Sequence, residues 1–198
     1  MIEEKALSKD GNSIWKITTD PSIEPITVDE LKLFARIDGN DEDTLLESFI
    51  TAARLNCEGY LGRALIEQTI TLMMDFWPGE VIKLPRPPLI SITAVETLDE
   101  DNNATEYSSD NYYTVTEAIP GELIIKRGVT QPYNNARDYR GYQIRYKAGY
   151  GNSRSDIPSG IKEGLKLWAT DVYENRVVRP EPPPEARQVL QLFRVIPI

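Results

Sequence analysis

The spacing of apolar residues changes twice along this chain, and the changes restrict it to a fold with both helices and a sheet. Apolar side chains recur at helical spacing over residues 42–61 and again over residues 157–176. Between these stretches Ile70, Leu72 and Met74 alternate with their neighbours, which is typical of a half-buried strand. We therefore expect helices on both sides of an antiparallel β-region.

Residues with defined capping roles mark the ends of the predicted helices. Thr27 and Glu30 have the spacing of a capping box, in which each side chain binds an orphan backbone N–H at a helix start. Gly62 is suited to ending the second helix. Asp156 is suited to capping the third long helix, and Pro158 to occupying its first turn.

These elements predict an α+β fold with a mainly helical body and a small antiparallel β-module inserted between the second and third long helices. Residues 1–25 are polar and contain glycine and proline, which predicts an N-terminal arm. The main domain is expected over residues 26–178. It comprises helices within 27–62, the β-module at 66–148 and a helix at 157–176. Residues 179–198 open with Arg-Pro-Glu-Pro-Pro-Pro, a stiff spacer before a C-terminal docking tail.

Composition excludes several classes of protein. The chain has 198 residues and no apolar run near the ~20 needed to span a bilayer, so we expect no contact with a membrane. It has no histidine, which removes His-based catalytic triads and His-containing zinc sites. Cys57 is expected to be a core residue, since no histidine can activate its thiol. The net charge of -9 argues against a tight grip on DNA phosphates.

Two other functional classes remain open on the residues alone. Carboxylate pairs such as Asp41 with Asp43, or Asp99 with Asp101, could serve a small carboxylate-dependent enzyme. Tyrosines and arginines within residues 137–150 could form a stacking platform in a nucleic-acid-binding module. Helix capping, loop solvation and cross-strand packing explain the same residues more simply.

Four segments follow one another in a distinctive order. They are a capped helix with an Arg-x-Asp turn at 27–43, a helix end leading into a strand at 60–69, a proline connector feeding a strand at 82–95, and a strand end followed by a long helix at 148–176. In this order and spacing they resemble the head-tail connector (adaptor) proteins of tailed bacteriophages and prophages.

The resemblance implies a structural role without catalytic residues, metal or cofactor. The chain would assemble as a dodecameric ring under the portal, join head to tail and extend the DNA channel. Its partners would be further copies of itself, the portal protein and a downstream neck or tail completion protein. DNA would pass through the channel without sequence-specific binding. The expected location is the virion neck, and the host bacterial cytoplasm during assembly.

Blocks of like charge suggest where copies could meet. Residues 38–47 carry five acidic and no basic groups, residues 96–110 six acidic and no basic groups, and residues 126–147 six basic groups and one acidic group. Opposite charges on different surfaces suit the heterologous contacts of a ring, although unrelated solvated surfaces explain the blocks as well. The candidate subunit-interface residues are Asp41, Asp43, Asp99, Asp101, Arg140, Arg145, Tyr173 and Arg176.

The C-terminal tail is the candidate docking segment for the portal. It follows a proline spacer, and it carries apolar residues that so short a segment has little means of burying. We therefore expect these side chains to be exposed and the rest of the chain to fold without them. The candidate docking residues are Val189, Leu190, Phe193, Arg194 and Ile196.

Overall fold

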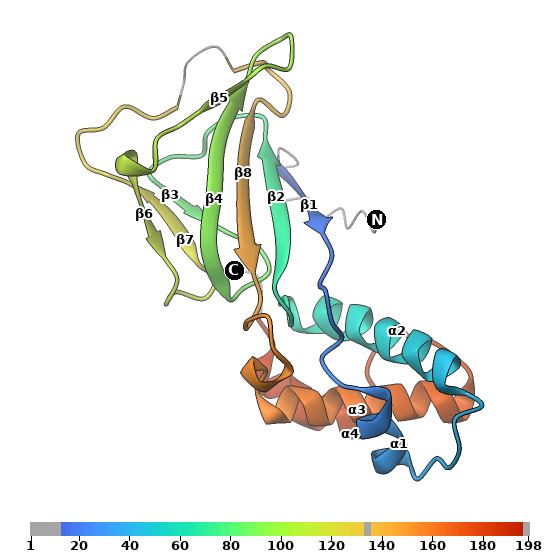
Figure 1. The fold of residues 1–198 in the computed structure, drawn as a ribbon. Helices are drawn as coiled ribbons and strands as arrows, with labels where there is room; N and C mark the ends of the chain where they lie inside the picture. The colour runs from blue at the N-terminus through green and yellow to red at the C-terminus, as the bar shows by residue number, and fades with distance from the viewer. Residues whose placement is uncertain (1–12, 133–135, 196–198) are drawn as a thin grey trace. The chain divides into compact units, whose positions relative to one another are not determined.

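The computed structural model describes residues 13–132 and 136–195, and the chain divides into two compact units (Figure 1). The β-unit combines the N-terminal segment up to Asp20 with residues 67–149. The helical unit combines residues 21–66 with the segment from Tyr150 onward. Each unit is therefore built from segments that lie far apart in the sequence.

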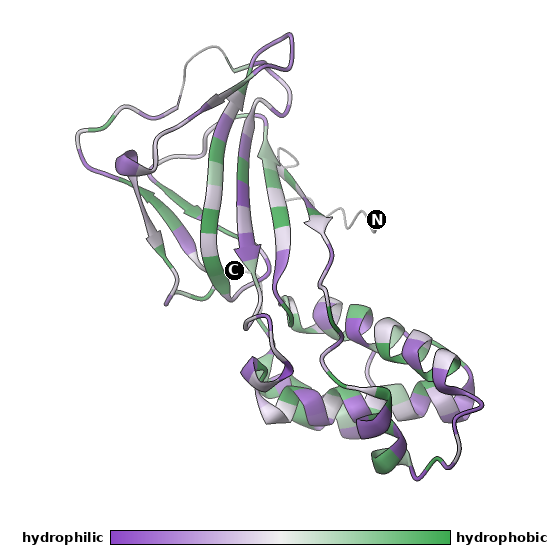
Figure 2. Cartoon of the chain, in the orientation of Figure 1, coloured by the Kyte–Doolittle hydropathy of each residue, from purple (hydrophilic) through white to green (hydrophobic). Residues whose placement is uncertain are grey.

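The larger sheet of the β-unit has five antiparallel strands. In spatial order they are β1 (Ser13–Thr19), β2 (Gln68–Met74), β8 (Tyr142–Ala148), β4 (Leu89–Leu98) and β5 (Ala104–Glu106). Apolar and polar bands alternate along β4 in Figure 2, as expected for a strand with one face toward a core. Register places Trp15 of β1 opposite Leu72 of β2, so the N-terminal strand adds buried apolar surface to the sheet.

The smaller sheet of the β-unit has three antiparallel strands. They are β3 (Val81–Lys83), β7 (Glu122–Ile125) and β6 (Tyr112–Val115), in that order. Leu123 and Ile125 of β7 are buried, whereas Glu122 and Ile124 on the opposite side are half-buried. This two-residue period is that of a strand with one face toward a core.

The helical unit contains four α-helices. They are α1 (Val28–Ala35), α2 (Asp43–Leu61), α3 (Ser159–Asn175) and α4 (Pro184–Leu190). Leu46 and Cys57 of α2 and Trp168 of α3 share one buried core. Within residues 13–132 and 136–195, none of the helices combines the length and apolar character needed to cross a bilayer.

The helix ends follow local chemistry. The predicted capping box is confirmed: the Glu30 N–H donates to Thr27 Oγ1 at 3.0 Å, and the Thr27 N–H donates to Glu30 Oε2 at 2.8 Å. Gly62 ends α2 with a φ of 67°, a backbone conformation that glycine adopts without steric cost. Asp156 does not cap α3. Its carboxylate instead accepts the Ser153 N–H at 3.0 Å and closes a short 3₁₀ turn before α3.

The mainly helical body predicted from the sequence is wrong. The described residues form eight strands in two antiparallel sheets together with four α-helices. Ile70, Val95 and Ile144 are fully buried in the β-unit, which is a compact unit in its own right and not a small insertion in a helix bundle. Its extent was underestimated because β1 precedes the first helix and joins the sheet only through pairing with β2.

Candidate functional site

A buried polar network within the helical unit connects α2 to the segment before α1. Arg54 on α2 places its Nε 2.7 Å from Glu24 Oε2 and an Nη 3.1 Å from Glu58 Oε2. The Leu65 N–H donates to the other Glu58 oxygen at 2.8 Å. Burial alone would lower the pKa of Arg54, but the Glu58 and Glu24 carboxylates raise it above its ordinary value. Arg54 therefore stays charged and joins the segment before α1 to α2.

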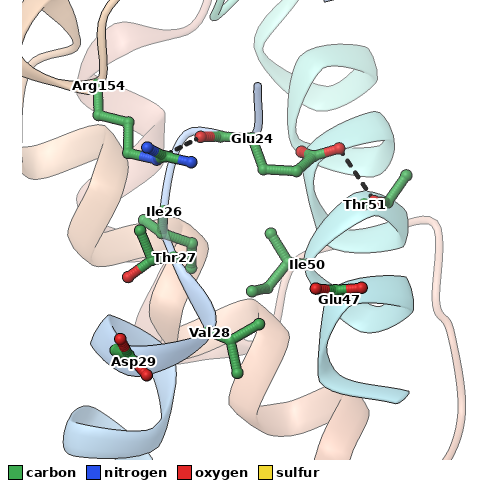
Figure 3. Close-up of a pocket in the computed structure, with 9 residues that line it drawn as sticks. All are labelled: Glu24, Ile26, Thr27, Val28, Asp29, Glu47, Ile50, Thr51 and Arg154. Atoms are coloured by element: carbon green, nitrogen blue, oxygen red, sulfur yellow. Dashed lines mark hydrogen bonds between the residues drawn. The ribbon is translucent and has the colours of Figure 1, made fainter. Parts of the chain in front are cut away.

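A cavity of about 450 Å³ lies beside this network in the helical unit (Figure 3). Ile26 and Ile50 line the cavity and are buried, and we call these two side chains its apolar floor. Glu24 is already engaged: its carboxylate accepts the Thr51 hydroxyl at 2.9 Å, and its carbonyl accepts Arg154 Nε at 2.9 Å. The full lining is Glu24, Ile26, Thr27, Val28, Asp29, Glu47, Ile50, Thr51 and Arg154.

Two carboxylates of this cavity face solvent without a partner. Asp29, in the first turn of α1, and Glu47, in the first turns of α2, are both exposed. In the part of the chain that the structure describes, neither makes an ion pair or a side-chain hydrogen bond. In the sequence Asp29 carries no signal beyond its place inside the capping box, and Glu47 is only one member of the acidic block at residues 38–47. The cavity thus combines an apolar floor with unneutralised negative charge at its rim.

Two candidate interface residues, Tyr173 and Arg176, meet at Glu42. The Tyr173 hydroxyl donates to Glu42 Oε2 at 2.6 Å, and an Arg176 Nη lies 2.8 Å from Glu42 Oε1. The hydrogen bond from Tyr173, followed by that from Arg176, lowers the pKa of Glu42, and the same bond raises the pKa of Tyr173. Their interactions hold the start of α2 to the end of α3, so both side chains are used within the chain.

Two of the four acidic candidates are held by local contacts. Asp43 pairs with Lys32 at 2.8 Å across α1 and α2. Asp99 accepts the backbone N–H groups of Asp101 and Asn103 at 3.0 and 2.8 Å, which orders the β4–β5 hairpin. Hydrogen bonds from the Asn103 side chain and backbone lower the pKa of Asp99. Asp41 and Asp101 are exposed.

The basic candidates also have partners in the same chain. Arg145 lies 3.0 Å from Glu96 on the neighbouring strand. Arg140 packs its guanidinium 5.0 Å above the Tyr139 ring, and its backbone N–H donates to Asp75 at 2.8 Å. Among the contacts of the described residues, none joins the acidic candidates to Arg140 or Arg145. The structure therefore brings Tyr173 to Arg176, while the opposite-charge contacts, which were predicted between copies, stay a prediction.

The tail is not the exposed segment expected from the sequence. Leu190 of α4 is 0% exposed and packs against α3 at Gly164, where an added Cβ would lie 2.5 Å from Leu190 Cγ. Phe193 packs against Gly160 in the same way, because a Cβ added at Gly160 would lie 2.9 Å from Phe193 Cε2. The expectation of exposure is wrong for Leu190, because two glycines one turn apart leave room on α3 for the tail to return.

The remaining docking candidates differ in position. Val189 is half-buried, as is Phe193. Arg194 is exposed, with its guanidinium 4.9 Å above the Tyr60 ring. Ile196 lies outside the described residues.

Of the tyrosines behind the nucleic-acid alternative, Tyr139 is exposed, whereas the two on β8 are buried. Tyr146 is fully buried and donates its hydroxyl to the Pro85 carbonyl at 2.9 Å, so it has no face on which a base could stack. Tyr142 is also buried. Burial raises the pKa of the Cys57 thiol, which suits the predicted core role. Across residues 13–132 and 136–195, no three His, Cys, Asp or Glu side chains gather in a way that could hold a metal ion.

Comparison with sequence families decides between these possibilities. The sequence model of the head completion protein family matches residues 24–196. The chain belongs to the head completion protein family. This membership confirms the resemblance to head-tail connectors, and with it the structural role in the phage neck expected for this chain.

Solved structures share the fold of this head completion protein. A chain in the neck of the empty gene transfer agent (GTA) particle, computed with C6 symmetry, superposes with a TM-score of 0.80 at 23% identity, covering 93% of this chain and 97% of that chain. A chain in the neck of the native GTA particle, computed with C12 symmetry, has a TM-score of 0.74 at 21% identity, covering 93% and 97%. No curated protein sequence matches the chain.

Proposed function

We propose that this head completion protein is a structural subunit that assembles as a ring in the phage neck and joins head to tail. The family match over residues 24–196 carries the proposal. The fold shared with chains from GTA necks of C6 and C12 symmetry supports the ring, because a closed ring repeats one heterologous contact between identical subunits.

The finer assignments follow from the same role. The ring binds the portal protein on the head side and a further neck or tail completion protein on the other, and DNA passes through its centre. A chain with a net charge of -9 is suited to surrounding DNA without gripping its phosphates. The protein is made in the host bacterial cytoplasm and ends in the virion neck. Its role is architectural, without catalysis.

The side chains that reach the portal are on the outer side of the tail. Leu190 is committed to the core of the helical unit. Arg194 is exposed and Val189 half-buried. We therefore assign portal contact to Arg194 and Val189 and not to Leu190.

Heads that lack only this protein provide the test. Purified protein added to such heads should produce a ring of density beneath the portal in electron micrographs, and tails should then attach. A matched sample receives the same concentration of protein pre-incubated in urea and left unfolded. Heads that acquire tails equally well without the protein would overturn the proposed function.

A further inference from the structure

The segment Val177–Arg179 between α3 and α4 exposes two apolar side chains to solvent. Val177 and Val178 are 48% and 52% exposed, and Arg179 is exposed as well. Among the described residues from 176 onward, the other arginines have partners, and Arg179 has none. Arg176 binds Glu42, Arg187 lies 2.7 Å from Glu181, and Arg194 stacks on Tyr60. The segment thus presents two apolar side chains and one unpaired cation.

The cavity beside α1 has the complementary character. Its floor is formed by the buried Ile26 and Ile50, the half-buried Val28 adds apolar surface, and its rim carries the unpaired carboxylates of Asp29 and Glu47. In Figure 3 these two carboxylates lie away from Arg154, whose Nε is bound to the Glu24 carbonyl. A volume of about 450 Å³ falls within the range of about 300–1,000 Å³ typical of binding pockets.

The cavity and the segment belong to different parts of the helical unit, because α1 and α2 contribute to the cavity lining and the segment follows the end of α3. Gly160 and Gly164 face α4, whereas Lys166 reaches α1 with its Nζ 5.1 Å from the Phe34 ring. Residues 164 and 166 are two positions apart, which is roughly 200° around a helix of 3.6 residues per turn. The segment leads from α3 to α4, while α1 forms part of the cavity, so the two surfaces are distinct parts of one subunit.

We propose that the cavity of each subunit receives the Val177–Arg179 segment of a neighbouring copy. This inference rests on the ring of the proposed function and names its contact. Val177 and Val178 pack against Val28, the half-buried apolar residue of the lining, and Arg179 neutralises Asp29 and Glu47. Because the two surfaces differ, the contact is heterologous and is repeated around the ring. It replaces contacts through Arg145 or Asp43, whose charges are already paired within the chain.

Engineered cysteines test the contact directly, because the single native cysteine is buried and is not expected to cross-link. Glu47→Cys and Arg179→Cys are made in separate chains, mixed in equal amounts, assembled on portal-bearing heads and oxidised. Disulfide-linked dimers are expected from the mixture, and monomers from either chain alone. Both changes in one chain should give a ladder of covalent oligomers. A control pair from the charge blocks, Asp41→Cys with Arg127→Cys, should give no dimers.

Charge reversal provides an independent readout. Arg179→Glu should reduce ring occupancy on heads by about tenfold or more, because it places like charges together at every interface. Adding Glu47→Arg to the same chain should restore assembly, whereas Arg127→Glu alone should leave it unchanged. Circular dichroism establishes that each variant is folded.

The outcomes separate this contact from the proposed function. Rings that form normally with Arg179→Glu and give no Glu47–Arg179 cross-link would overturn the contact and leave the ring standing. A cross-link from Glu47→Cys to a portal or neck protein would also overturn it, because another partner would then occupy the cavity. Failure of the unmodified protein to form any ring would instead count against the proposed function.

Discussion

Arg54 shows how a single buried charge can be tolerated in the helical unit. Its side chain is only 7% exposed, yet carboxylates of Glu24 and Glu58 meet it at 2.7 and 3.1 Å. Glu58 is itself buried and accepts the Leu65 N–H. Such a network does not have to add stability over an apolar core, but removing one member leaves a buried charge without its partner.

Replacing Arg54 should therefore be costly. We expect Arg54→Leu to lower the free energy of unfolding by about 3–5 kcal/mol, because Glu58 would remain buried after losing the guanidinium that it binds. Urea denaturation followed by circular dichroism measures the change. Glu47→Gln on the exposed side of the same helix is the control and should stay within about 0.5 kcal/mol of the unmodified protein. Equal stability of the two variants would contradict the role of the network.

A second residue-scale prediction concerns acid. Hydrogen bonds from Tyr173 and Arg176 lower the pKa of Glu42 from its ordinary value of 4.5. A carboxyl with a lowered folded-state pKa contributes stability above its unfolded pKa and loses it as the pH falls through the folded value. Glu42→Gln should therefore flatten the decrease in stability below about pH 4.5. Urea denaturation at a series of pH values measures this, with Asp41→Asn as the control. An unchanged acid limb in Glu42→Gln would rule the linkage out.

At the scale of elements, the contact between α3 and α4 decides the fate of the tail. Leu190 and Ala186 of α4 are fully buried in the core of the helical unit. Gly160 and Gly164 make this possible, because any side chain there would meet Phe193 or Leu190. Contrary to the sequence-based expectation, removal of residues after Val178 should expose this core and destabilise the helical unit.

Gly164, which packs against another helix, and Gly59, which does not, should respond oppositely to replacement by alanine. Gly164→Ala should destabilise the helical unit and make α4 sensitive to protease, because the added Cβ lies 2.5 Å from Leu190 Cγ. Gly59→Ala on α2 meets nothing within 4 Å and should raise stability by about 0.5–1 kcal/mol through helix propensity. Thermal unfolding and limited proteolysis measure both. A gain in stability in both variants would contradict the packing of α4 against Gly164.

At the scale of the whole molecule, charge is distributed in a way that suits assembly. The chain carries a net charge of -9, and several basic side chains, such as Arg145 and Arg176, are already paired internally. Among the described residues Asp29, Glu47 and Arg179 are exposed without an ion-pair partner, and the proposed contact between copies uses them. Each exposed pair contributes at most ~1 kcal/mol, but a ring repeats the contact at every interface.

Ring assembly should consequently weaken as salt is added. Raising the ionic strength from about 0.15 M to about 1 M shortens the screening length from roughly 8 Å to roughly 3 Å, which weakens attraction between exposed charges. Ring occupancy on portal-bearing heads, counted in electron micrographs at each salt concentration, should decrease over this range. Constant occupancy would mean that apolar contacts hold the ring instead.

Local chemistry was readable from the sequence. Thr27 and Glu30 cap α1, Gly62 ends α2, and the two-residue period gives the strands, because each of these features depends on neighbours a few positions away. The order of the motifs also predicted the family, which the match over residues 24–196 confirms. The positions of the main helices and of strands such as β2, and the structural role, could therefore be predicted from the sequence alone.

The tertiary structure alone decided where distant segments meet. β1 becomes a sheet strand only through pairing with β2, about fifty residues later, and this enlarged the β-unit beyond the expected small module. The tail is buried because Leu190 finds Gly164 on another helix. The cavity lined by Ile26 and Ile50 likewise forms only when segments that are distant in the sequence lie side by side. Local spacing carries no information on such contacts, because they depend on the shapes of surfaces that form only when the chain has folded.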